Sequence, residues 1–426
     1  METQTIICGA GIAGIATAYY LSVKYGKKNI VLIDRLLPLS LTTSKSGENY
    51  RDYWPQACMT EFTTHSLDLM DELIAGEDGN IFEMHEIGYD FISANNADIF
   101  PSSYNDNIDM SDYLQRLVDK DELKIQKPYL DDSISQVVNV KRAGVLDVNA
   151  LGTLMLAKAK KADVIFKQAL IEDIKQNKDD DYIVTIKDEQ QGATEQLQCS
   201  ELILAAGPFI AKLAQMLDID LPVENYLQHK FIIPDPKGAV PRDMPFSIYA
   251  DNQYLNWTDE EKDMIAQDEE YAHLLAEYPP GLHIKPEGRN QIKLGWAFNR
   301  TAEDPQWETT TKAEFADIVI RGASRFIPAL KQYIDNMPTP IVHFSGYYTR
   351  TKENWPIIGP LQTKGLYIVG ALSGYGTMSG CSAGELCADY MNDAELPSYA
   401  KYFHPNRYNN EEVMEEIAAI SSDGQL

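Results

Sequence analysis

Six residues near the start of the chain could bind phosphate groups through their backbone. They follow the pattern G-x-G-x-x-G and are Gly9, Ala10, Gly11, Ile12, Ala13 and Gly14. Residues 5–8 before this pattern predict a short buried strand, and residues 15–25 after it predict a helix. A second apolar strand ends on Asp34, about 20 residues after Gly14, as the dinucleotide fingerprint requires. Such a turn presents backbone N–H groups and a helix N-terminus to phosphates, while the acid binds a ribose hydroxyl. The pattern therefore predicts a βαβ unit that binds a dinucleotide.

A second glycine-rich turn lies near the end of the chain. Residues 365–370 predict a strand and residues 379–390 predict a helix of small residues. The turn between them contains Ser373, Gly374, Tyr375, Gly376, Thr377 and Met378. The first fingerprint alone serves NAD, NADP and FAD. In a flavoprotein, a second turn of this kind can place backbone N–H groups near the flavin ring, so the pair of turns favours FAD.

Taken in order, these motifs resemble those of the D-amino-acid-oxidase-like flavoprotein superfamily, in particular its glycine oxidase and sarcosine oxidase branch. The resemblance covers most of the chain. Residues 43–51 resemble the family's second flavin loop. Residues 145–147, with the helix after them and residues 164–174, resemble the stretch that contacts the adenine half. Residues 202–209 resemble a strand that ends in A-A-G-x-W/F. The resemblance implies bound FAD and oxidation of a C–N bond in an amine or amino acid.

The motifs and the resemblance together nominate the residues that would contact the cofactor. They come from the first turn, the end of the second strand, the loop at 43–51, residues 202–209 and the C-terminal turn. The candidates are Gly9, Gly11, Ile12, Ala13, Gly14, Asp34, Arg35, Thr43, Ser44, Ser46, Gly47, Ala206, Gly207, Gly374, Tyr375, Gly376, Thr377 and Met378.

One lysine is implied to take part in the reaction with oxygen. Residues 291–295 resemble the sarcosine oxidase strand whose lysine lies over the flavin, which makes Lys293 the candidate for that role. A buried ammonium would stabilise the superoxide and peroxide anions that form beside reduced flavin. The alternative is a solvated strand lysine with no part in the reaction.

Three positions depart from the sarcosine oxidase or glycine oxidase pattern. Gly346 stands where sarcosine oxidases carry the cysteine that bonds to the flavin, so we expect non-covalent FAD. Met378 stands where sarcosine oxidases carry a lysine for the substrate carboxylate. Tyr348 stands where glycine oxidases carry a carboxylate-binding arginine and sarcosine oxidases a tyrosine. Both usual carboxylate anchors are therefore expected to be absent.

Other side chains could replace the missing anchors. Arg51, at the end of the second flavin loop, is the favoured carboxylate ligand, whereas Arg300 and Arg350 are favoured as surface residues. Among the many aromatic residues we retain three that could face the flavin, Tyr348, Tyr375 and Trp296. His283 and His343 are interpreted as strand residues with satisfied hydrogen bonds. A general base is not required, because a neutral amine can transfer hydride directly to the flavin.

The elements that must position these residues predict an α/β chain in which a Rossmann-like FAD-binding domain is interleaved with an antiparallel-sheet substrate domain. Residues 1–95, 140–221 and 341–426 are assigned to the FAD-binding domain. Residues 96–139 and 222–340 are assigned to the substrate-binding domain, with short helices expected over 101–125. The acidic, helical stretch at 259–271 is interpreted as a solvated face in preference to a lid.

Composition narrows the class of protein. The chain has 426 residues and a net charge of −27, which excludes nucleic acid and anionic lipid as partners. The five cysteines show no metal-binding spacing, and no apolar run is long enough to span a membrane. Reduced thiols and the lack of a signal peptide predict a cytoplasmic protein without a bound metal. The acid excess also favours a cationic or neutral amine substrate, and the oligomeric state stays open.

Three interpretations of function follow. The first is a soluble FAD-dependent oxidase that converts an amine or amino acid to an imine, with oxygen, or alternatively a quinone, as electron acceptor. Reoxidation by oxygen would yield hydrogen peroxide. The second keeps the fold but is a dehydrogenase or desaturase that tailors a cyclic or carrier-bound amine without oxygen. The third, a non-catalytic FAD-binding subunit, is disfavoured by the two intact glycine-rich turns.

Overall fold

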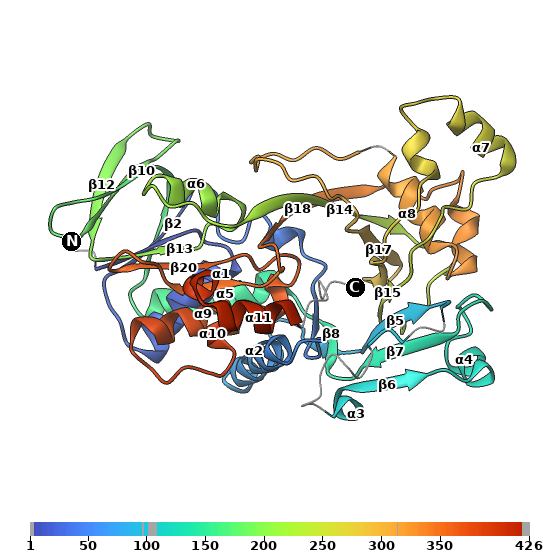
Figure 1. Cartoon of the computed structure of the whole chain (residues 1–426), viewed down its shortest axis with the longest axis horizontal. Coiled ribbons are helices and arrows are strands. Elements are labelled where there is room, and N and C mark those ends of the chain that lie inside the picture. Colours follow the sequence, from blue (N-terminus) through green and yellow to red (C-terminus); the bar gives the residue numbers. More distant parts are fainter. Residues whose placement is uncertain (1–3, 96–97, 101–108, 313, 420–426) are drawn as a thin grey trace.

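The computed structural model describes residues 4–95, 98–100, 109–312 and 314–419 (Figure 1). One half of the molecule is built on a six-stranded sheet in the order β19-β20-β13-β1-β2-β9. All neighbouring strands are parallel except β19 and β20. The strands are β1 (Thr5–Cys8), β2 (Ile30–Asp34), β9 (Ile165–Gln168), β13 (Glu201–Leu204), β19 (Ile357–Pro360) and β20 (Leu366–Gly370). Segments from the start, middle and end of the chain thus share one sheet.

Both faces of this sheet are covered, which explains the apolar run of its central strands. Ile7 and Leu32 pack under the helices on one face, while Ile6 and Val31 pack against the other layer. The helical face carries α1 (Ile12–Tyr19) with its π-helical continuation (Tyr20–Lys24), α2 (Ala57–Ala75), α5 (Val148–Lys161) and α9 (Gly376–Met391) (Figure 1). The opposite face carries α6 (Ile210–Gln215) and the meander of β10 (Leu170–Gln176), β11 (Tyr182–Lys187) and β12 (Thr194–Cys199).

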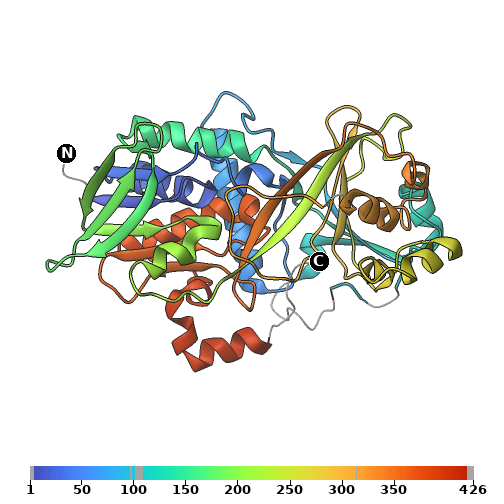
Figure 2. The ribbon, with the colours of Figure 1, turned by 90° about the horizontal axis from the view of Figure 1, so that it is seen from above.

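The other half of the molecule is an eight-stranded sheet in the order β18-β14-β17-β16-β15-β5-β7-β6. Its strands are β5 (Tyr89–Ser93), β6 (Leu114–Leu117), β7 (Gln136–Val140), β14 (Glu224–Pro234), β15 (Phe246–Tyr249), β16 (Leu282–Glu287), β17 (Gln291–Trp296) and β18 (Val342–Arg350). The predicted antiparallel pairing is confirmed at every step except β15 with β5, which is parallel. The long strands β14 and β18 run side by side across the junction of the two halves (Figure 2). Buried residues of α8 (Phe315–Ala323) pack into the core of this half.

The structure differs from the sequence prediction in the segment before β7. Short helices were expected over 101–125, and α3 (Met110–Tyr113) and α4 (Lys120–Gln126) are present, but β6 lies between them. Residues 101–108 lie outside the described part. β5 and β18 join the eight-stranded sheet, although they fall in ranges that the sequence assigned to the FAD-binding domain. Alternation along a strand predicts its faces but not its partners, so the domain boundaries stay a prediction.

Three short strands and several small helices complete the fold. β3 (Asn49–Arg51), β8 (Ala143–Val145) and β4 (His85–Glu86) form a small sheet. The acidic α7 (Asp259–Ala266) has no buried residue, and α10 (Ala400–Phe403) and α11 (Glu411–Ala419) lie near the chain's end. Within the described ranges, none of the helices has the length and apolar character that crossing a bilayer would need.

A network of charges joins helices on the helical face of the six-stranded sheet. Lys24 Nζ lies 2.9 Å from both Glu385 Oε1 and Asp389 Oδ1. His65 Nε2 lies 2.5 Å from Glu385 Oε2. The hydrogen bond to Glu385 raises the pKa of His65 above its ordinary value. These contacts link the π-helical continuation of α1 to α2 and α9, and the residues that make them do not line the cavities described below.

The network predicts a pH-dependent contribution to stability. Because the folded chain raises the pKa of His65, the contribution is complete below the pKa of an unfolded histidine and is lost as the pH rises through the folded value. His65→Gln is expected to lower the free energy of unfolding by about 0.5–1 kcal/mol at pH 5, and by less at pH 9. Chemical denaturation of both proteins at the two pH values measures this, and an equal loss at each would contradict it.

Candidate active site

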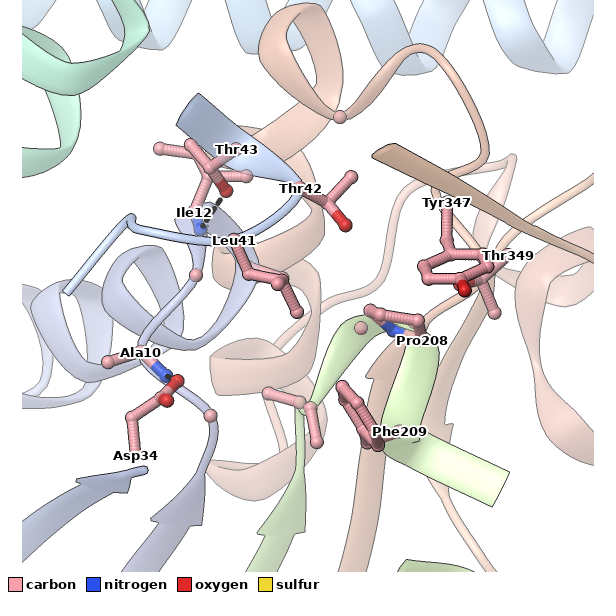
Figure 3. A pocket seen from close by; sticks show the side chains of 18 of the residues that line it. Ala10, Ile12, Asp34, Leu41, Thr42, Thr43, Pro208, Phe209, Tyr347 and Thr349 are labelled. Carbon is pink, nitrogen blue, oxygen red and sulfur yellow. Dashed lines mark hydrogen bonds between the residues drawn. The ribbon is translucent and has the colours of Figure 1, made fainter. Parts of the chain in front are cut away.

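A large cavity of about 320 Å³ lies at the carboxyl ends of the parallel strands. This edge of an open parallel sheet is where such folds bind their ligands. Residues at the carboxyl ends of β1, β2, β13 and β20, or directly after them, line the cavity. They include Gly9, Gly11, Asp34, Ala205, Ala206, Ala371 and Leu372. Figure 3 shows Ala10 and Asp34 on one side of the cavity and Phe209 and Tyr347 on another.

The first turn is held in shape by close backbone contacts. Gly9 has a φ of +117°, and a Cβ there would lie 2.3 Å from the carbonyl oxygen of Ala205. A Cβ at Gly14 would lie 1.9 Å from the carbonyl oxygen of Gly9. Gly14 does not line the cavity, so it serves the packing of α1 against the turn. Only glycine fits at these two positions without a shift of the backbone.

Asp34 fixes the end of β2 against the same turn. Its Oδ2 accepts the N–H of Ala10 at 2.7 Å, and its Oδ1 accepts the N–H of Leu36 at 2.9 Å (Figure 3). Burial raises the pKa of this carboxyl, while the two backbone N–H groups act in the opposite direction. The carboxylate is therefore immobilised at the cavity wall, where a ribose hydroxyl could reach it.

The space around Gly11 indicates whether the cavity suits a dinucleotide. A Cβ at Gly11 would meet only Thr43 Oγ1, at 3.5 Å, so the fold itself does not require glycine there. The position instead keeps open the space in front of the N-terminus of α1, where Ile12 donates its N–H to Thr43 Oγ1. An open N-terminus that adjoins a fixed carboxylate suits a pyrophosphate and its ribose. These residues fit the dinucleotide that the sequence predicts.

A smaller cavity of about 100 Å³ adjoins the first. Five residues line both cavities and mark the junction between them: Ser46, Gly47, Lys230, Tyr348 and Gly374. The loop at 43–51 is tied to the C-terminal turn here, because the hydroxyls of Ser46 and Thr377 are 2.6 Å apart. A Cβ at Gly374 would lie 2.6 Å from the ring of Tyr348, so glycine lets that ring reach the junction.

The smaller cavity gathers cations among aromatic side chains. Arg51, Lys230 and Arg300 line it together with one carboxylate, Glu48. Arg51 is only 2% exposed, and its guanidinium carbon lies 4.2 Å from the Trp54 ring centroid. The remaining lining residues include Tyr89, Phe246, Ile248, His283, Ala297, Tyr375 and Met378. Arg300 is exposed, as the sequence indicated, and it also lines this cavity.

His283 is an uncharged wall of the smaller cavity. Burial lowers the pKa of its imidazole to about 3, and the nearby Lys230 acts in the same direction. Its Nδ1 lies 3.1 Å from the carbonyl oxygen of Gly281. At neutral pH this histidine is therefore neutral and a weak base.

Lys293 is buried but lines neither cavity among the described residues. Its ammonium lies 2.9 Å from Glu48 Oε2 and 3.3 Å from Glu287 Oε2. Lys285 on the next strand shares Glu287, and burial lowers the pKa of that lysine. The oxygen-reaction role of Lys293 stays a prediction, but two carboxylates already neutralise this ammonium.

Lys230 is the buried lysine at the junction, and the sequence analysis did not identify it. The residue is 7% exposed, and its Nζ lies 5.5 Å from the Tyr348 ring centroid and 3.5 Å from the carbonyl oxygen of Lys45. Among the described residues, Lys230 forms no ion pair with a carboxylate. Its cross-strand partner Gly295 leaves it space, because a Cβ there would lie 2.8 Å from Lys230 Cγ.

The other predicted site residues are distributed between the two cavities and the core. Those at the larger cavity include Ile12, Ala13, Arg35, Thr43, Gly207, Gly376 and Thr377, while Tyr375 and Met378 line the smaller one. Ser44 lines neither, because its hydroxyl donates to the carbonyl oxygens of Ser40 and Leu41. Trp296 is fully buried beside Tyr278 and lines neither cavity. Trp307 lines the larger cavity, and no motif marked it in advance.

Three solved structures share this fold. L-proline dehydrogenase from P. horikoshii has 18% identity and a TM-score of 0.73 over 96% of this chain and 98% of its own. Glycine oxidase from Bacillus cereus has 15% identity and a TM-score of 0.70 over 94% and 100%. Iminodiacetate oxidase from a Chelativorans species has 17% identity and a TM-score of 0.70 over 94% and 99%. At these identities the likeness shows the fold alone.

Comparison of sequences gives a more specific result. No curated protein matches the chain. The model of the DAO family, described as FAD dependent oxidoreductase, matches residues 4–390 and so spans both glycine-rich turns and both cavities. The chain therefore belongs to the FAD dependent oxidoreductase family.

Proposed function

We propose that the chain uses FAD to oxidise a C–N bond of an amine or amino acid to an imine. The observation that carries this proposal is the junction between the two cavities. The larger cavity suits a dinucleotide, and the smaller one has room for a small molecule at its end. Proline, glycine and iminodiacetate, which appear in the names of the three proteins of similar fold, each have a C–N bond next to a carboxylate.

FAD would be held without a covalent bond to the chain. Asp34 and the N-terminus of α1 would hold its ribose and phosphates, and the loop at 43–51 would cover the flavin with the C-terminal turn. When bound, FAD accepts a hydride from the carbon next to the substrate nitrogen and passes the electrons to an acceptor. Gly346 lines the larger cavity, and none of the five cysteines lines either cavity in the described chain. Release of free flavin on denaturation tests this.

The charges of the smaller cavity favour a substrate that carries a carboxylate. Arg51, Lys230 and Arg300 outnumber Glu48 there, although the whole chain has a net charge of −27. These local cations therefore counteract the electrostatic field of the acidic chain. The sequence prediction of a neutral or cationic amine substrate used the net charge of the chain and did not include these local cations. Trp54, Tyr89 and Phe246 would orient the apolar part of such an amino acid.

Oxygen is our proposed acceptor, and the similar fold of a proline dehydrogenase favours a second candidate. In that candidate the same cavity would oxidise a cyclic or carrier-bound amine, and the electrons would go to another acceptor. The two candidates therefore differ in the class of substrate and in the electron acceptor. In the first candidate a buried lysine, Lys230 or Lys293, would assist the reaction with oxygen.

The visible spectrum of the purified protein tests the proposal. We expect anaerobic bleaching with amino acids from a panel of primary and secondary amines, and little bleaching with the matching amines that lack a carboxylate. Readmission of air should restore the absorbance and yield hydrogen peroxide. Reduced flavin that persists in air but is oxidised rapidly by a quinone would support the dehydrogenase. A flavin that no member of the panel reduces would overturn both.

A further inference from the structure

A long segment without regular secondary structure crosses from the eight-stranded sheet to the larger cavity. It comprises residues 297–312 between β17 and α8, and we call it the strap. In Figure 1 it appears in orange, extending over β14 and β18 towards α6. Trp307 of the strap lines the larger cavity, together with Lys230 of β14 and Tyr347 of β18.

Hydrogen bonds to two strands fasten the strap along its length. The N–H of Glu303 donates to the carbonyl oxygen of Asn225 on β14 at 2.9 Å. The hydroxyl of Tyr347 on β18 donates to Glu303 Oε1 at 2.9 Å and accepts the N–H of Gln306 at 3.1 Å. Ser345 Oγ donates to Thr309 Oγ1 at 2.7 Å. These hydrogen bonds hold the strap in place. The ring of Tyr347 lines the larger cavity, so this residue connects the strap to that cavity.

The tip of the strap takes part in a stack at the wall of the larger cavity. The Trp307 ring lies on the Phe209 ring, with centroids 3.8 Å apart and planes 13° apart. The guanidinium of Arg35 lies 4.7 Å from the Trp307 ring centroid, and Glu189 holds Arg35 through two N–H groups. Trp307, Phe209 and Arg35 all line the cavity. Arg35 also follows Asp34 directly, so the stack stands beside the predicted ribose position.

From this geometry we propose that Trp307 clasps the bound cofactor, and that FAD leaves the protein only when the strap opens. Phe209 and Arg35 belong to the half that carries the glycine turns, whereas Trp307 comes from the substrate half. The stack therefore closes the cavity wall by joining the two halves. Opening it breaks a stacked aromatic pair and a cation–π contact, which makes cofactor release slower. The proposal concerns retention of FAD and does not depend on which substrate is oxidised.

The rate of FAD release from the holoenzyme tests the clasp. Trp307→Ala should release flavin about tenfold faster after dilution, as measured by the rise in flavin fluorescence, and Trp307→Phe should stay close to the wild type. Trp257→Ala is the matched control, because Trp257 also lies over an arginine, Arg321, at 4.1 Å but lines neither cavity. Equal release by Trp307→Ala and the wild type would overturn the proposal, as would equal acceleration by the control.

A second variant tests the strap without removing the tryptophan. Tyr347→Phe keeps the ring at the cavity but removes the hydroxyl that fastens Glu303 and Gln306. The expected release is about fivefold faster, since one or two hydrogen bonds of the strap are lost. An unchanged rate in Tyr347→Phe would show that the strap's fastening does not control release. Loss of amine oxidation with normal flavin release would concern the proposed function and leave the clasp standing.

Discussion

Replacing Gly11 with valine is expected to give a folded protein that no longer retains FAD. The backbone at position 11 is extended, with a φ of −76°, and a Cβ there would meet only Thr43 Oγ1 at 3.5 Å. Valine is therefore compatible with the fold but fills the space in front of α1, where phosphates would approach the helix N-terminus. Loss of even two charge-assisted hydrogen bonds, at about 1.5 kcal/mol or more each, predicts at least about 100-fold weaker FAD binding. The flavin content of the purified variant and titration with FAD measure it.

Two comparisons make this prediction specific. Gly14→Ala should act on the fold instead, because its Cβ would lie 1.9 Å from the carbonyl oxygen of Gly9 and the backbone must shift. Gly76→Val is a matched control at the exposed end of α2, where the nearest atoms to a Cβ are 3.6 Å away. The circular dichroism and thermal midpoint of the Gly11→Val apoprotein should match those of the wild-type apoprotein. Normal flavin content in this variant would refute the phosphate site at α1.

The cofactor cavity was the most predictable part of the site because its constraints are local. Gly9 is required by its φ of +117° and Gly14 by its close approach to Gly9 in the same turn, while Gly11 borders the open space in front of α1, so their spacing is visible in the sequence. The strand that ends on Asp34 can also be recognised in the sequence from its run of apolar residues. Local rules of this kind need no knowledge of which strands become neighbours.

The substrate side could not be predicted to the same extent, since it depends on strand pairing. β5 pairs with β15 and β7, which no alternation pattern specifies. Trp307 reaches the larger cavity only because the strap is fastened to β14 and β18. Arg300 is exposed as predicted, but its place beside the smaller cavity follows from the strap and could not be foreseen. Charge counting over the whole chain likewise could not reveal the cations that meet at one small cavity.

Register explains why two lysines compete for one role. Lys230 pairs with Gly295, and Lys293 pairs with Ile232, so both lysines lie on the same face of the eight-stranded sheet. They are separated by two positions along the strands, about 7 Å. The lysine that the sequence pattern marks and the lysine at the junction therefore share one sheet face but belong to neighbouring strands. Glu48 and Glu287 neutralise Lys293, whereas Lys230 lines both cavities.

Lys230→Met is consequently expected to slow reoxidation of the reduced enzyme by air by about 100-fold, the usual effect of removing one group that stabilises a developing anion. Lys293→Met should have a smaller effect on this step and act through Glu48, which would lose its partner. Anaerobic reduction by substrate followed by mixing with oxygen in a stopped-flow instrument separates the two half-reactions. Lys331→Met, at an exposed position outside both cavities, is the control for net charge. If Lys293→Met slows reoxidation far more than Lys230→Met, the ammonium that assists oxygen is Lys293, and the assignment from the junction is wrong.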